Sequence, residues 1–142
     1  MALPMQSGKG KPRFRGARGF TFVELMVVLT IMVVLITVAI PIYNKTILRA
    51  KESVLHNNLI TLRTVIDNYT YDKMKAPQSL EDLVNEGYLR DVPNDPMTGS
   101  NQTWKTIMEE PGQSVDQNQP GIWDVKSGSN KTSLEGSAYS DW

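Results

Sequence analysis

One stretch of this chain constrains its fold more than any other. From Leu25 to Tyr43 there are 19 consecutive residues without a charge. Continued back to Phe20 as a helix, with a rise of 1.5 Å per residue, the apolar run would be about 36 Å long. The hydrocarbon core of a bilayer is about 30 Å thick. A chain of 142 residues builds one modest domain, too small to bury such a helix. The sequence therefore predicts a single membrane span.

The two sides of the apolar run differ in charge. Residues 1–19 carry five basic residues and no acidic one, whereas the remainder carries ten basic and fifteen acidic residues. Because basic residues beside a membrane helix favour the cytoplasmic side, we expect the N-terminus in the cytoplasm and the C-terminal domain outside. A basic tail could instead bind nucleic acid. Its place directly before a membrane span argues against that partner, and no nucleic acid is expected.

The residue content excludes several classes of site. The chain has no cysteine and a single histidine, His56. This excludes a disulfide framework, a thiol nucleophile and a cysteine-ligated metal. The sequence also offers no Gly-rich phosphate loop and no histidine beside a plausible nucleophile. We therefore expect a protein that is not an enzyme.

Glu24 is the one charged residue inside the apolar run. A carboxylate within a membrane costs on the order of 3 kcal/mol and needs a partner. Glu24 lies only one turn into the run, so in a monomer it could reach the cytoplasmic interface. If it stays in the apolar core it needs a cation as partner, because leaving a charge alone there is expensive.

No small-residue cleavage site of a secretory signal peptide follows the apolar run. The stretch RGFTFVELMVVLTIMVVLITVAIPIYN instead resembles the N-terminal signature of type IV pilins and pseudopilins. The resemblance implies that a prepilin peptidase cuts between Gly19 and Phe20 and methylates the new amine of Phe20. It also implies that Glu24 pairs with the Phe20 amine of a neighbouring subunit during assembly.

Pro41 stands at the family's helix-kinking position. Proline lacks an N–H and clashes with the carbonyl four residues back, so Pro41 either kinks the helix or ends it. We favour a kink because helical periodicity resumes after it. In that second half His56 and Arg63 are expected to be solvated. The apolar stripe expected to pack on a small sheet comprises Leu48, Leu55, Leu59, Leu62, Ile66 and Tyr69.

Local signals predict the remaining elements. The long helix is expected to end before Pro77, because the residue preceding a proline disfavours helical geometry. Ser79 and Asp82 have the spacing of a capping box, and they begin a short helix expected over residues 80–86. Gly87 can end that helix. Strands are expected at 104–108 and 122–126, joined by a polar connection and followed by an irregular tail of sixteen residues.

A second resemblance concerns the C-terminal half. SLEDLVNEGYLRDVPNDPMTGSNQTW, with IWDVKSGS and the terminal tryptophan, resembles the major pseudopilin of the type II secretion system. The implied fold is α+β and pilin-like, with a long N-terminal helix packed on a small antiparallel sheet. The implied domains are a cleaved cytoplasmic leader (1–19), a transmembrane and filament-core helix (20–43) and a periplasmic globular domain (44–142).

A C-terminal loop of that pseudopilin group binds calcium, a cation that takes six to eight oxygen ligands. The group's adjacent aspartates are missing here. We therefore expect that no cofactor is required, although a calcium ion could bind. The alternative is a metal-free tail held by Leu134, Tyr139 and Trp142. The calcium candidates are Asp124, Ser133, Glu135 and Asp141.

The resemblance implies a structural subunit of a filament in a secretion system. Its expected partners are copies of itself, the prepilin peptidase, an inner-membrane platform protein, an assembly ATPase, minor pseudopilins and, before assembly, membrane lipid. The expected location is the bacterial inner membrane, as a single-pass protein. One alternative is a pilin of a type IV pilus that serves adhesion, twitching motility or DNA uptake. Another is a membrane-anchored monomer whose outer domain binds a ligand.

Overall fold

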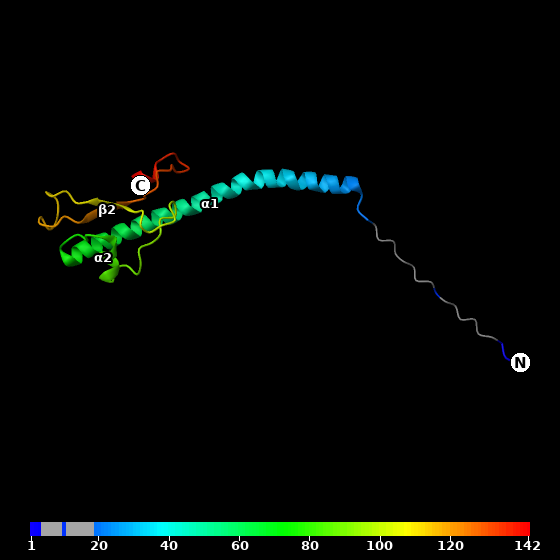
Figure 1. The fold of residues 1–142 in the computed structure, drawn as a ribbon, viewed down its shortest axis with the longest axis horizontal. Helices are drawn as coiled ribbons and strands as arrows, with labels where there is room; N and C mark the ends of the chain where they lie inside the picture. The colour runs from blue at the N-terminus through cyan, green and yellow to red at the C-terminus, as the bar shows by residue number, and fades with distance from the viewer. Residues whose placement is uncertain (4–9, 11–18) are drawn as a thin grey trace. The chain divides into compact units, whose positions relative to one another are not determined.

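The computed structural model describes residues 1–3, 10 and 19–142 (Figure 1). Most of the predicted leader, residues 1–19, lies outside the described residues. The chain divides into two compact units, Met1–Ile40 and Pro41–Trp142, whereas the predicted domain boundary falls slightly later, after Tyr43. The elements are helix α1 (Phe22–Lys73), helix α2 (Leu80–Asn85), strand β1 (Lys105–Met108), strand β2 (Ile122–Lys126) and the 3-10 helix η1 (Tyr139–Asp141).

The part of α1 that belongs to the first unit is exposed on every side. Each residue from Phe22 to Ile40 is solvent-accessible, including all of the large apolar side chains. Its two threonines bond to the helix backbone. The Thr30 hydroxyl donates to the Met26 carbonyl and the Thr37 hydroxyl donates to the Val33 carbonyl, each at 2.8 Å. No side chain of this segment is buried within the described part of the first unit.

The part of α1 from Pro41 to Lys73 carries the core of the second unit. The predicted stripe is confirmed, although Leu48, its first member, is only half-buried. Full burial of an aliphatic side chain stabilises a fold by about 1.5–3 kcal/mol, so this stripe is a main source of stability. The buried members are Leu55, Leu59, Leu62, Ile66 and Tyr69.

Helix α1 ends at Lys73, before Pro77 as predicted. The short helix α2 then begins at the predicted capping box. Ser79 Oγ accepts from the Asp82 amide at 3.2 Å, and an Asp82 carboxylate oxygen accepts from the Ser79 amide at 3.0 Å. After α2 ends, Gly87 has φ +80°, a conformation that glycine adopts readily. Leu80 and Leu83 direct the buried side of α2 into the core.

The two predicted strands form an antiparallel pair with one register shift, between Ile107 and Met108. Strand β1 begins at Lys105, one residue later than predicted. Strand β2 contributes Ile122 and Val125 to the core, while Trp123 between them is exposed. This alternation follows from the two-residue side-chain period of a strand. In Figure 1 the pair lies beside the second half of α1, and the core cluster of buried residues joins α1, α2, β2 and η1. The predicted α+β class is confirmed.

The last sixteen residues are irregular, as predicted, but they are closely integrated into the fold. They contain the bridge between Thr132 and Ala138, and then η1. Asp95, which is fully buried, holds the start of this segment: one carboxylate oxygen accepts from Ser127 Oγ at 2.6 Å and from the Gly128 amide at 3.2 Å. The other oxygen accepts from the Met97 amide at 2.8 Å. Buried Asp95, in the loop between α2 and β1, thus anchors the C-terminal segment.

Candidate assembly site

The beginning of α1 positions the predicted assembly carboxylate. Thr21 lies directly before the helix, and its Oγ1 accepts from the Glu24 amide at 3.1 Å. The Thr21 carbonyl accepts from the Leu25 amide, also at 3.1 Å. This is the geometry of an N-cap, which satisfies a donor left free at a helix start. Thr21 and Glu24 also have the Thr-x-x-Glu spacing of a capping box, a local signal from which this helix start could have been predicted.

Glu24 lies in the first turn of α1. The N-terminal end of a helix carries partial positive charge, which favours a carboxylate there. Neither ion pair found among the described residues involves Glu24. Its immediate neighbours Val23 and Leu25 are exposed apolar side chains. The site is therefore a carboxylate, set at a fixed helical position, on an otherwise apolar surface.

The predicted cleavage point lies just outside the helix. Gly19 and Phe20 both precede α1, which begins at Phe22. Phe20 is exposed, and a side chain added at Gly19 would meet no atom within 4 Å. A peptide bond outside regular structure and open to solvent can be reached by a peptidase. Cleavage there would leave a free amine four residues before Glu24.

Comparisons with known proteins match the same region. Residues 14–40 match the Prokaryotic N-terminal methylation motif. A competence protein ComGC from Halalkalibacterium halodurans is 34% identical over 79 residues, which cover 56% of this chain and 78% of that protein. The chain belongs to the type IV pilin-like family.

Two further relatives extend the similarity. Type II secretion system core protein G from Klebsiella michiganensis is 28% identical over 106 residues, covering 63% of the pilin-like chain and 75% of the relative. Its counterpart from Pectobacterium carotovorum is 29% identical over 107 residues, covering 64% and 68% respectively. No solved structure matches the chain significantly. The resemblance to the major pseudopilin of that secretion system is thereby confirmed.

The membrane prediction rests on α1. Among the described residues of the pilin-like chain, α1 is the helix long and apolar enough to cross a membrane. Pro41 lies within α1, at the boundary between the two compact units. The alternative that Pro41 ends the helix is therefore wrong, whereas its role as a kink stays a prediction.

Two of the predicted calcium ligands of the pilin-like chain, Asp124 and Ser133, are engaged with other side chains. Asp124 accepts an ion pair from Arg63, and Ser133 Oγ lies 2.9 Å from Ser137 Oγ. Glu135 and Asp141 are exposed. The described residues contain no group of three or more carboxylates or histidines that could hold a metal. Since calcium requires several oxygens around one point, this arrangement does not fit the ion.

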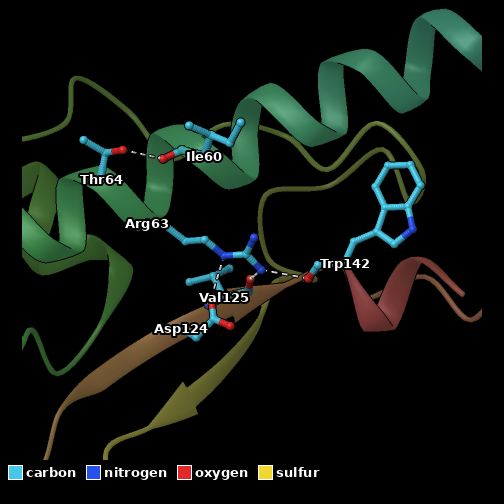
Figure 2. A network of polar contacts seen from close by, with 6 residues as sticks. All are labelled: Ile60, Arg63, Thr64, Asp124, Val125 and Trp142. Atoms are coloured by element: carbon cyan, nitrogen blue, oxygen red, sulfur yellow. Dashed lines mark hydrogen bonds and ion pairs between the residues drawn. The ribbon is translucent and has the colours of Figure 1, made fainter. Parts of the chain in front are cut away.

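The expectation that Arg63 is solvated is wrong. Its Nε donates to Asp124 Oδ1 at 2.7 Å, and its Nη2 donates to the main-chain oxygens of Val125 at 3.2 Å and Trp142 at 2.7 Å (Figure 2). The prediction failed because these partners lie 61 to 79 residues away in the sequence. No local pattern could have indicated them.

A second carboxylate on α1 also binds the C-terminal segment. Glu52 Oε1 accepts from the Leu134 amide and from the Tyr139 hydroxyl, both at 2.8 Å. Burial, followed by this hydrogen bond, raises the pKa of Tyr139 to about 12. His56, which is exposed as predicted, meets the Trp142 ring edge-on, with 6.3 Å between ring centroids. Helix α1 thus holds this segment at more than one place.

Proposed function

We propose that this chain is the major pseudopilin of a type II secretion system, a structural subunit that polymerises into a helical filament. One observation carries the proposal: Glu24 stands at a capped helix start, on an exposed apolar surface, directly behind an accessible Gly19–Phe20 bond. The similarity to two core proteins G supports the choice of a secretion filament.

The precursor would first be a single-pass protein of the inner membrane. Its basic residues before Gly19 favour a cytoplasmic leader, and the second unit would then face the periplasm. A prepilin peptidase would cut after Gly19 and methylate the amine of Phe20. This cleavage would convert a neutral peptide nitrogen into a cation at the edge of the apolar helix.

Assembly would then pair opposite charges between subunits. The Phe20 amine of one subunit would meet the Glu24 carboxylate of its neighbour as their apolar helices leave the bilayer and pack together. A missing partner would leave a buried charge, which is strongly destabilising. The pair would therefore select one register of addition, while the packed apolar surface supplies most of the attraction.

The subunit would not supply the energy for this process. We propose a structural role without catalysis, in which an assembly ATPase and an inner-membrane platform protein drive the addition of subunits. Minor pseudopilins would complete the filament. Growth of the filament would push exported proteins across the outer membrane. No cofactor is required in this scheme.

A second candidate function is a pilin of a type IV pilus, serving adhesion, twitching motility or DNA uptake. The similarity to a competence protein favours it. The two functions differ in the consequence of deleting the gene in the native host. Loss of exported enzymes would support the secretion filament. Loss of DNA uptake or motility, with secretion intact, would support the pilus.

The test of processing and assembly is the intact mass of the chain recovered from membranes and sheared filaments. We expect a mass that starts at Phe20 and includes one methyl group. A Glu24→Gln variant should be processed but fail to enter filaments, whereas Glu81→Gln, at an exposed site in α2, should assemble normally. A mass that starts at Met1 in normal cells, with a functional Glu24→Gln protein, would favour a membrane-anchored monomer instead.

A further inference from the structure

We infer that the guanidinium of Arg63 is the cation that holds the C-terminal segment, residues 127–142, against the rest of the second unit. The segment then holds its position without calcium. This inference concerns the stability of the subunit and does not depend on whether the chain forms a secretion filament or a pilus.

The contacts of Arg63 join three parts of the chain. The guanidinium projects from α1 and binds Asp124 and Val125 on β2, together with the main-chain oxygen of Trp142 (Figure 2). All three acceptors are oxygens, the atoms that a hard cation would also seek. A planar guanidinium binds several oxygens at once through its fixed set of N–H donors. One side chain therefore ties the helix, the strand and the end of the segment together.

The same contacts use the oxygens that calcium would need. Asp124 Oδ1 accepts from both Arg63 Nε and the Val125 amide, each at 2.7 Å. The Ser133 hydroxyl is engaged with Ser137, whose Oγ lies at 2.9 Å and whose amide donates to it at 3.1 Å. At two of its four predicted ligands a calcium ion would therefore compete with these partners. The remaining two, Glu135 and Asp141, offer exposed carboxylates without a cluster around them in the described chain.

Charge also disfavours a divalent ion at this place. Arginine stays protonated at any physiological pH, and its Nε is in direct contact with Asp124. Glu135 and Arg63 line one groove, together with Glu52, His56 and Trp142. A calcium ion bound to either carboxylate would face this fixed positive charge at short range. Asp124, the acidic candidate on β2, is therefore already paired with a cation that belongs to the chain.

Glu52 provides an independent anchor for the middle of the segment. It binds the Leu134 amide and the Tyr139 hydroxyl, and it precedes Arg63 by about three helical turns on α1. These contacts are intramolecular, so their strength does not depend on the concentration of a solute. A metal site would instead lose its stabilising effect as the free ion is removed. This difference makes the inference testable without any mutation.

The first experiment measures amide hydrogen exchange of the full chain in detergent micelles, in millimolar calcium and in excess chelator. We expect peptides that cover residues 127–142 to exchange at the same rate in both conditions. Faster exchange of these peptides in chelator, reversed by adding calcium, would overturn the inference.

The second experiment compares Arg63→Gln with wild type under the same conditions. Hydrogen bonds to charged groups contribute enough that exchange in residues 127–142 should accelerate about ten- to a hundredfold. Peptides from Phe22 to Ile40 should not change. The matched control is Arg49→Gln, because Arg49 is exposed on the same helix and takes part in neither ion pair of the described chain. Unchanged exchange in Arg63→Gln would contradict the inference.

Arg63→Lys covers the case in which Arg63→Gln does not fold. Lysine keeps the positive charge but lacks the planar fork. We expect exchange in residues 127–142 between that of wild type and that of Arg63→Gln, again without any response to calcium. Calcium-dependent protection of the wild type would overturn the inference whatever the variants do.

Discussion

The two parts of α1 are both regular helix, but their side chains lie in different surroundings. From Phe22 to Ile40 every side chain is exposed, although nearly all are apolar. From Pro41 to Lys73 one stripe is buried under α2, β2 and the C-terminal segment, while the other faces are exposed. Most of the stability of a helix in a protein comes from packing of its apolar face, so an apolar helix surface needs a partner. The second part finds that partner within the chain, and the first must find it in lipid or in other subunits.

The sharpest test of this comparison exchanges leucine for alanine in each part. Leu62 is fully buried, so Leu62→Ala should lower the free energy of unfolding of the second unit by about 2–5 kcal/mol. Leu29→Ala should leave that free energy unchanged, because Leu29 is exposed in the other unit. Denaturant unfolding of the full chain in detergent, followed by tryptophan fluorescence, measures both. Equal losses in the two variants would break the comparison.

A substitution at Gly128 tests how closely the C-terminal segment packs against the rest of the second unit. A Cβ added there would overlap the Thr103 carbonyl oxygen, a main-chain atom that cannot move aside cheaply. Gly128→Ala should therefore cost about 3 kcal/mol, the upper end of the range usual for overpacking. The same unfolding assay measures this loss. Gly112→Ala, where an added Cβ would meet nothing within 4 Å, is the control and should have little effect.

Tyr139 should make the free energy of unfolding of the second unit depend on pH. Its pKa rises from the ordinary value of 10.0 to about 12 in the folded chain, because of burial and the bond to Glu52. Above about pH 10 the unfolded chain loses this proton first, so the free energy of unfolding falls as pH rises towards 12. The total loss should be on the order of 3 kcal/mol.

A pH series of unfolding measurements on wild type and Tyr139→Phe tests this prediction. The variant should lack the extra decline between pH 10 and 12. Tyr71→Phe should retain it, because Tyr71 is exposed. An identical decline in wild type and Tyr139→Phe would mean that Tyr139 is not held protonated by the fold.

The smallest expected effect is the loss of one capping hydrogen bond at the start of α2. Ser79 caps α2 through its Oγ, so Ser79→Ala should lower the free energy of unfolding by about 1 kcal/mol. Ser79→Asp keeps a capping acceptor and should stay close to wild type. A loss in Ser79→Ala as large as that of Leu62→Ala would show that capping, rather than burial, dominates the second unit.

Predictions based on local patterns were confirmed most fully. The apolar stripe of α1, the capping box of Ser79 and both strands follow from periodicities and spacings within a few residues. The end of α2 differs by one residue from the prediction, because Glu86 is the C-cap and not part of the helix. Helix ends depend on single backbone bonds and are the least constrained feature of a local pattern.

Long-range polar contacts could not be predicted in the same way. Arg63 reads as one more polar residue off the apolar stripe, and Asp95 as part of a turn-forming loop. In the structure Arg63 joins β2 to the chain end, and buried Asp95 anchors Ser127 and Gly128. The partners of Arg63, and the two residues through which Asp95 holds the C-terminal segment, are more than thirty residues away, so no spacing signals them.

A long apolar helix with one carboxylate near its start, followed by a small α+β unit, could be read directly from the order of the residues. These properties follow from composition, charge and short-range periodicity, which act before any tertiary contact forms. The way in which the C-terminal segment is held emerged from the folded chain alone. Its anchors are single polar side chains that are far apart in the sequence. They come within hydrogen-bonding distance of their partners only when the core around Leu59 and Leu62 has formed.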